Sequence, residues 1–68
     1  MLLTMEQLDE LVGFELSDDS FFSEGTVIEL DGGAWELVEI VGCNLVFEIS
    51  DCIEDAQANM LFFAERAE

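Results

Sequence analysis

The sequence has no histidine, lysine, tyrosine or proline, and its single basic side chain is Arg66. Nucleophilic catalysis pairs a Ser, Cys or Lys with a general base, and the missing residue types remove the usual bases. Carboxylate pairs can perform acid–base work. The candidate pairs, Glu29 with Glu36 and Asp18 with Asp19, are however expected on an open sheet face and in a loop. We therefore expect a protein that is not an enzyme.

The shortage of basic residues also limits the ligands of the chain. Proteins that bind DNA or RNA place several Lys and Arg side chains against phosphates, so we expect no direct binding of nucleic acid. An anionic membrane surface would repel the chain, and no apolar run approaches the ~20 residues of a membrane span. The opening residues, MLLTMEQL, lack the basic start and long apolar run of a signal peptide. The expected location is the cytoplasm of a bacterial host cell.

Cysteine is scarce as well. Cys43 and Cys52 are too few for a disulfide scaffold or a cysteine-based metal site. We expect both to be buried or half-buried, and a bridge between them is left open. The acidic residues also lack the spacing of a calcium loop, since Asp18-Asp19-Ser20 is not followed by the required glycine. We expect no metal and no other cofactor.

Acidic residues are what the chain has in excess. Among its 68 residues are 17 Asp and Glu, and the formal net charge is −16. Disordered acidic chains have few aromatic residues and low hydrophobicity, whereas six Phe, one Trp and 51% hydrophobic residues predict one folded domain over 1–68. A fold of this mass exposes roughly 4,300 Å². Evenly spread charges would lie about 16 Å apart, beyond the ~8 Å screening length, so only clustered acids would create a strong local potential.

The middle of the chain predicts a three-stranded antiparallel meander. Its runs are rich in β-branched and aromatic residues and are separated by Gly, Asp and Asn: the predicted strands are 26–30, 34–41 and 45–50. With Gly32-Gly33 at the centre of a two-residue turn, Leu30 would face Trp35 and Glu29 would face Glu36. Like charges opposite one another destabilise a ladder, and no basic residue occurs in these strands to compensate.

The direction of Glu39 is left open. Glu36 and Glu39 have opposite parity, so a regular strand would point one of them toward the face that carries Trp35 and Leu37. A β-bulge near Leu37–Val38 would turn both glutamates outward; alternatively, Glu39 lies near the sheet margin. In the third strand Glu48 is expected on the face opposite the core, after a three-residue loop whose last residue is left-handed; that loop is Gly42-Cys43-Asn44.

Two helices flank the predicted sheet. Thr4 and Gln7 have the spacing of a capping box, which predicts a short helix over 5–12. An apolar stripe with a 3-4-3-4 spacing predicts a longer helix over 52–66 that packs on the sheet, with Asp51 and Glu54 as a second capping pair. The fold class is therefore α+β. The predicted core residues are Leu8, Ile28, Leu30, Trp35, Leu37, Phe47, Ile49, Ile53, Met60 and Phe63.

The segment 14–24 is less patterned. Residues 14–16 are consistent with an edge strand or with coil, and the Ser and Asp residues of 17–20 predict a loop. Phe21 and Phe22 either anchor this loop in the core or form an exposed contact patch. Phe62 lies off the centre of the apolar stripe of the C-terminal helix and is expected at the surface.

The small size, the acidic charge and the near absence of Lys and Arg resemble those of inhibitors made by phages and mobile elements. These are the anti-CRISPR proteins, the anti-restriction proteins and the uracil-DNA glycosylase inhibitors. The resemblance implies a stoichiometric inhibitor that acts as a DNA mimic, with carboxylates making the Arg contacts that phosphates otherwise make. Among these classes we favour an anti-CRISPR protein, since that class is rich in folds this small.

The predicted partner is accordingly a basic nucleic-acid-binding protein, such as a CRISPR effector or a restriction enzyme. The predicted partner-binding residues are sheet glutamates and loop aspartates: Glu29, Glu36, Glu39, Glu48, Asp18 and Asp19. The chain is expected to be a monomer or a weak dimer. Two alternatives remain: a protein–protein interaction module that uses Phe21, Phe22 and Phe62, and a domain whose acidic surface is an adaptation to high salt.

Overall fold

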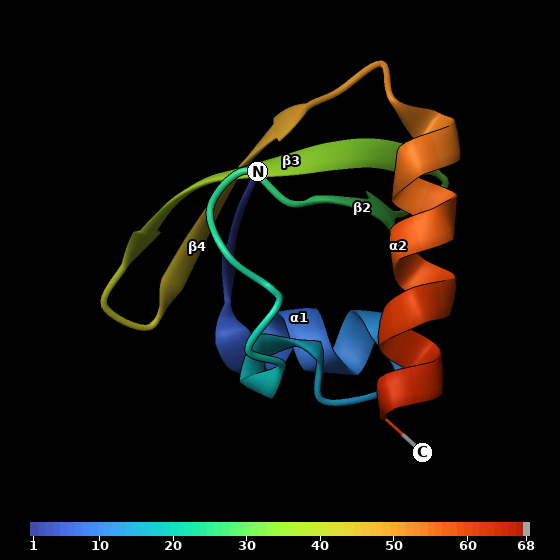
Figure 1. Cartoon of the computed structure of the whole chain (residues 1–68). Coiled ribbons are helices and arrows are strands. Elements are labelled where there is room, and N and C mark those ends of the chain that lie inside the picture. The colour runs from blue at the N-terminus through green and yellow to red at the C-terminus, as the bar shows by residue number, and fades with distance from the viewer. Residues whose placement is uncertain (68) are drawn as a thin grey trace.

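Two helices and a four-stranded antiparallel sheet enclose one apolar core in the computed structural model, which describes residues 1–67 (Figure 1). The strands lie in the order β1-β4-β3-β2. Helix α2 runs down the β2 side of the sheet, and α1 lies across the far side of the core (Figure 1). The elements are β1 (Leu2–Thr4), α1 (Met5–Val12), the 3₁₀ turn η1 (Leu16–Asp18), β2 (Val27–Leu30), β3 (Gly33–Val41), β4 (Asn44–Ile49) and α2 (Ile53–Arg66).

The α+β class, both helices and the β2-β3-β4 meander are confirmed, but the sheet has a fourth strand, β1. This strand pairs antiparallel with β4, Leu2 lying opposite Val46. Its pairing extends to Met1, whose amino group donates to the Phe47 carbonyl at 2.8 Å while the Phe47 N–H donates back at 2.8 Å. Three residues are too few to show a period-2 pattern, so the sequence did not reveal this strand.

The predicted register between β2 and β3 is wrong by two residues. The turn is Asp31-Gly32, with φ values of 53° and 80°, and Leu30 pairs with Gly33. A two-residue hairpin turn of type I′ needs positive φ at both central residues, and Asp-Gly is a preferred pair for it. Ile28 therefore faces Trp35, and Glu29 faces Ala34 rather than Glu36. Because the shift is even, each side chain stays on its predicted face.

A β-bulge in β3 settles the direction of Glu39. The pairing shifts between Leu37 and Glu39, so that Leu37 lies opposite Phe47 and Glu39 lies opposite Val46. The extra residue, Val38, turns Glu39 to the same face as Glu36, as the bulge alternative predicted. The next loop has two residues rather than the predicted three, because Val41 pairs with Asn44 around Gly42-Cys43, and its left-handed residue is Gly42 (φ 62°).

The core contains most of the predicted residues together with others from the loop 14–24. Trp35 and Met60 are partly buried against it. The prediction that Ile49 and Ile53 belong to the core is wrong, since they are 77% and 36% exposed. Ile49 lies at the end of β4, and α2 packs against β2 and β3 instead. The buried cluster consists of Leu8, Leu16, Phe22, Ile28, Leu30, Leu37, Leu45, Phe47 and Phe63.

The N-terminal cap of α1 is the one that the sequence predicted, whereas that of α2 is not. At α1 the Gln7 N–H donates to Thr4 Oγ1 at 3.1 Å, and the Thr4 N–H donates to Gln7 Oε1 at 3.0 Å. The predicted Asp51–Glu54 pair does not cap α2, whose N-cap is Cys52 and makes no side-chain cap bond. The helix begins at Ile53, one residue too late for Asp51 to be its cap, and Ser50 Oγ accepts from the Cys52 N–H at 3.2 Å.

Both edges of the sheet are restricted. At the β2 edge, Asn59 of α2 donates its side-chain N–H to the Val27 carbonyl at 2.8 Å. At the other edge β1 has three residues, and the capping box takes the Thr4 N–H. Open edges invite pairing with another chain, so these contacts leave little backbone available for it. No helix within residues 1–67 has both the length and the apolar character needed to cross a bilayer.

Candidate functional site

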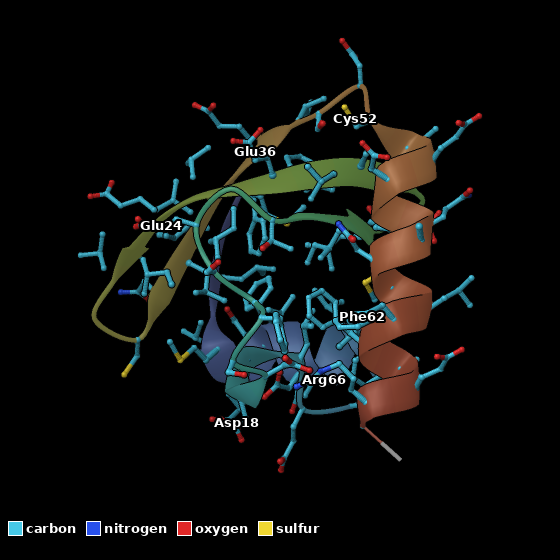
Figure 2. The ribbon with its side chains drawn as sticks, viewed as in Figure 1. Asp18, Glu24, Glu36, Cys52, Phe62 and Arg66 are labelled. Atoms are coloured by element: carbon cyan, nitrogen blue, oxygen red, sulfur yellow. The ribbon has the colours of Figure 1, made fainter. Side chains whose placement is uncertain are left out.

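The face of the sheet that points away from the helices carries four of the predicted site residues: Glu29, Glu36, Glu39 and Glu48. Figure 2 shows Glu36 on this side of the sheet, away from α1. The cross-strand repulsion predicted for Glu29 and Glu36 is instead between Glu36 and Glu48, which lie directly opposite one another. Glu29 is diagonal to Glu36, and Glu39 is diagonal to Glu48. We call these four residues the acidic row.

The spacing within the acidic row is close enough for a strong combined potential. Residues directly opposite in an antiparallel pair have Cβ atoms about 5 Å apart, and diagonal neighbours are about 7–8 Å apart. The accessible surface is 4338 Å², in agreement with the area expected from the mass. An even distribution would therefore space the charges about twice as widely as the row does. Neighbouring glutamates of the row lie within the ~8 Å screening length, so each charge acts on the next.

The other two predicted residues lie elsewhere. Asp18 and Asp19 belong to the segment beside the C-terminal end of α2, and Figure 2 shows Asp18 on the opposite side of the molecule from Glu36. Asp19 Oδ2 accepts from Arg66 Nε at 2.8 Å. This bond, with a second from the Phe21 N–H, lowers the pKa of the Asp19 carboxyl below its ordinary value of 3.8. The structure therefore does not bring the loop aspartates into one site with the acidic row.

The Arg66–Asp19 ion pair also concerns the acidic row, because it engages the one basic side chain of the sequence. Arg66 is the only basic side chain of the protein, and Asp19 engages it. Across residues 1–67, then, the acidic row has no basic side chain as a partner. No ion pair within residues 1–67 therefore relieves the mutual repulsion of the row.

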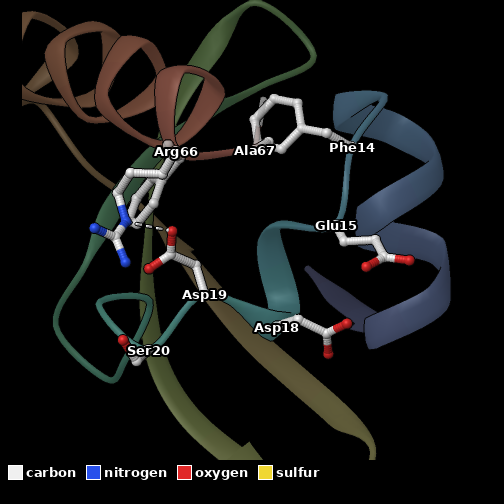
Figure 3. A pocket seen from close by; sticks show the side chains of 8 residues that line it. Phe14, Glu15, Asp18, Asp19, Ser20, Arg66 and Ala67 are labelled. Carbon is white, nitrogen blue, oxygen red and sulfur yellow. Dashed lines mark hydrogen bonds and ion pairs between the residues drawn. The ribbon is translucent and has the colours of Figure 1, made fainter.

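An open groove of about 600 Å³ lies beside the ion pair (Figure 3). In Figure 3 the Asp19 carboxylate turns toward Arg66, whereas the carboxylates of Glu15 and Asp18 turn away from it. These groups do not converge on a common point. In the described part of the chain, no three His, Cys, Asp or Glu side chains gather in a way that could hold a metal ion.

Comparison with known proteins gives no relative. No family model, no curated protein and no solved structure matches this chain. Function is therefore inferred from the surfaces of the molecule.

The aromatic residues of the alternative site divide between surface and core. Phe22 is buried, where its ring contacts that of Phe63 edge to face at 6.2 Å. Phe21 and Phe62 are 60% and 43% exposed and contact each other edge to face at 5.8 Å. The Arg66 guanidinium lies 4.5 Å from the Phe21 centroid and 5.3 Å from that of Phe62. The two exposed rings thus form a small patch, and the Arg66 guanidinium lies against it.

Several surface residues were not recognised from the sequence. Glu24 is one, because its carboxylate accepts from the Ile40 N–H at 3.0 Å, where β3 extends past the end of β2. Only the position of the bulge reveals that this N–H needs a partner. Leu2 is another, since it reaches the outer face through the unpredicted strand β1. Cys43 and Cys52 are free and exposed, which corrects the expectation that they are buried or half-buried and leaves no bridge between them.

Proposed function

We propose that this protein is a stoichiometric inhibitor that imitates nucleic acid and blocks the basic groove of a nucleic-acid-binding protein. The observation that carries the proposal is the acidic row, which lies on a sheet face that no other element covers. Its four carboxylates have no basic partner among residues 1–67. This charge destabilises the free sheet, and a complementary basic surface would relieve it.

The chemistry of the row supports this role. A carboxylate accepts two parallel N–H bonds from an Arg side chain in the same way as a phosphate does. Spacings of about 5–8 Å between neighbours allow adjacent Arg or Lys side chains to engage different glutamates at once. The sheet also holds the carboxylate-bearing residues in fixed positions, so binding orders little additional backbone.

The proposed target class is a protein whose groove is lined with Lys and Arg for phosphate binding. Among such proteins we favour a CRISPR effector, in keeping with the resemblance in size and charge to anti-CRISPR proteins. The inhibitor would bind the effector and exclude its nucleic acid, without binding nucleic acid itself.

Capture followed by competition tests the proposal. The protein is immobilised, exposed to a bacterial lysate supplemented with CRISPR effector complexes, and then washed separately with excess duplex DNA and with excess single-stranded DNA. We expect a basic protein to be retained and then released by at least one of the two forms of DNA. Binding should also weaken steeply as the salt concentration rises.

Two variants of equal charge locate the binding surface. The first changes the row by Glu36→Gln and Glu48→Gln, and the second changes exposed helix residues by Glu6→Gln and Glu10→Gln. We expect the first to lose the captured protein and the second to keep it. Capture that survives the first change, or that neither form of DNA reverses, would contradict the proposal.

A further inference from the structure

Three apolar side chains lie beside the acidic row on the same face of the sheet. Leu2 of β1 lies opposite Val46 of β4, and Val46 lies opposite Glu39 of β3. Val41 lies opposite Asn44, diagonal to Val46. We call Leu2, Val41 and Val46 the apolar corner.

The apolar corner is open to solvent. Leu2 is 65% exposed and Val41 is 52% exposed, whereas Val46 is half-buried. Both helices pack on the opposite face of the sheet, against the core that contains Leu45 and Phe47. The corner therefore contributes apolar surface that the fold itself does not use.

The pairing of Leu2 with Val46 brings the side chains of the apolar corner close to one another. Met1 and Phe47 exchange two backbone hydrogen bonds, so the next pair, Leu2 with Val46, is of the type that is not hydrogen-bonded. Side chains approach most closely in such pairs. With Val41 about 7–8 Å away on the diagonal, the three side chains form one patch, and Glu39 lies at its border.

A partner that covers the acidic row thus meets an apolar patch at the same time. Charge complementarity requires Lys or Arg opposite the row, and the corner requires an apolar or aromatic side chain next to them. Grooves that bind unpaired nucleic acid have this composition, because aromatic side chains stack on the bases while basic side chains track the backbone. A groove that only follows the phosphates of a duplex needs no such side chain.

We infer that the partner is a protein groove in which an exposed aromatic or aliphatic side chain lies directly beside Arg or Lys residues, as in grooves for single-stranded nucleic acid. The acidic row takes the place of phosphates and the apolar corner takes the place of an unstacked base. This inference rests on the proposed function, and it adds the chemistry of the surface that the inhibitor covers.

Two fluorescein-labelled peptides of equal charge test the inference. One alternates Arg with Gly and the other alternates Arg with Phe, and their binding to the full chain is followed by fluorescence anisotropy at 50 and 300 mM NaCl. We expect the Arg-Phe peptide to bind about tenfold more tightly, because burying part of an apolar side chain has an effect of that size. We expect both peptides to bind more weakly at the higher salt concentration.

Variants separate the two components of binding. Leu2→Gln should remove the preference for the Arg-Phe peptide while leaving the salt dependence unchanged. If Leu2→Gln disrupts β1, Val41→Thr serves instead and should have the same effect. Leu11→Gln is the matched control, since Leu11 is 62% exposed on α1, and it should keep the preference. Glu36→Gln with Glu48→Gln should weaken both peptides and flatten the salt dependence.

The outcomes distinguish the inference from the proposed function. Equal binding of the two peptides, or a preference that survives both corner variants, would overturn the inference alone. Failure of both peptides to bind in a salt-dependent way would overturn the proposed function as well. A dimer in light scattering that Leu2→Gln dissociates would show that the corner binds a second copy of the chain, and this result too would overturn the inference.

Discussion

The cross-strand pair Glu36–Glu48 permits a quantitative test of the acidic row. The two residues lie directly opposite one another in the β3–β4 ladder. With their carboxylates about 6 Å apart in water, the Coulomb repulsion is about 0.7 kcal/mol. Screening reduces it to about 0.6 kcal/mol at 10 mM salt, about 0.3 kcal/mol at 0.15 M and about 0.1 kcal/mol at 1 M.

A double-mutant cycle isolates this repulsion. Glu36→Gln, Glu48→Gln and the double variant are unfolded with urea, and Trp35 fluorescence reports the transition. Each single variant should be more stable than the parent at low salt. The second neutralisation should add less than the first, and the shortfall should equal the coupling. A gain of about 0.6 kcal/mol corresponds to about 2–5 °C in Tm for a domain of this size.

A second cycle provides the control. Glu29 and Glu48 lie on β2 and β4 with β3 between them, and are offset by two residues along the strands, so they are about 12 Å apart. Their coupling should be less than half as large at 10 mM salt. A coupling of equal size in the two cycles, or one that persists at 1 M salt, would refute the pairing and the electrostatic explanation.

Three further predictions concern the β2–β3 turn and the Arg66–Asp19 ion pair. Gly32→Ala should cost about 1 kcal/mol in urea unfolding because Gly32 has φ 80°, whereas Gly33→Ala should be tolerated, since a Cβ there meets Trp35 Nε1 at an ordinary 3.6 Å. Arg66→Met should lose a cation–π contact of about 0.5–1 kcal/mol and increase the mobility of the 16–24 segment, as measured by amide hydrogen exchange. Asp19 has a lowered pKa in the folded state, so its stabilising effect should be present above its ordinary value of 3.8 and be lost as the pH falls through the folded pKa. The stability difference between the parent and Asp19→Asn, measured from pH 6 to pH 2, should therefore vanish at the acid end.

The elements of the fold were predictable where a pattern extends over several residues. The alternation of apolar and polar residues predicted the strands of the meander, and the apolar stripe predicted α2. The capping box predicted the start of α1. The strand β1 was not predictable, because it exists through its pairing with β4, more than forty residues away. The same is true of Leu16 and Phe22, which are buried by packing against distant elements.

The face shared by three of the sheet glutamates was predictable from the sequence, whereas their pairing was not. The period of two placed Glu29, Glu36 and Glu48 on one face, and an even error in register did not change that. Whether Glu29 faces Glu36 depended on which pair, Asp31-Gly32 or Gly32-Gly33, forms the turn. The Glu36–Glu48 pairing depends on the two-residue turn at 42–43 and on the bulge in β3. The engagement of Asp19 by Arg66 joins residues 47 positions apart, so no local pattern could separate Asp19 from the acidic row.

The contact between Asn59 and the Val27 carbonyl bears on how the protein behaves when it is abundant. An inhibitor of the proposed kind must accumulate at least to the concentration of its target, and crowded β-proteins polymerise through strands that accept a neighbour. One side-chain amide from α2 occupies the first carbonyl of β2, and β1 is too short to seed a ladder. Replacing Asn59 by an apolar residue should therefore affect resistance to aggregation more than binding. Concentrated samples should begin to form thioflavin-positive fibres, while freshly diluted protein keeps its affinity.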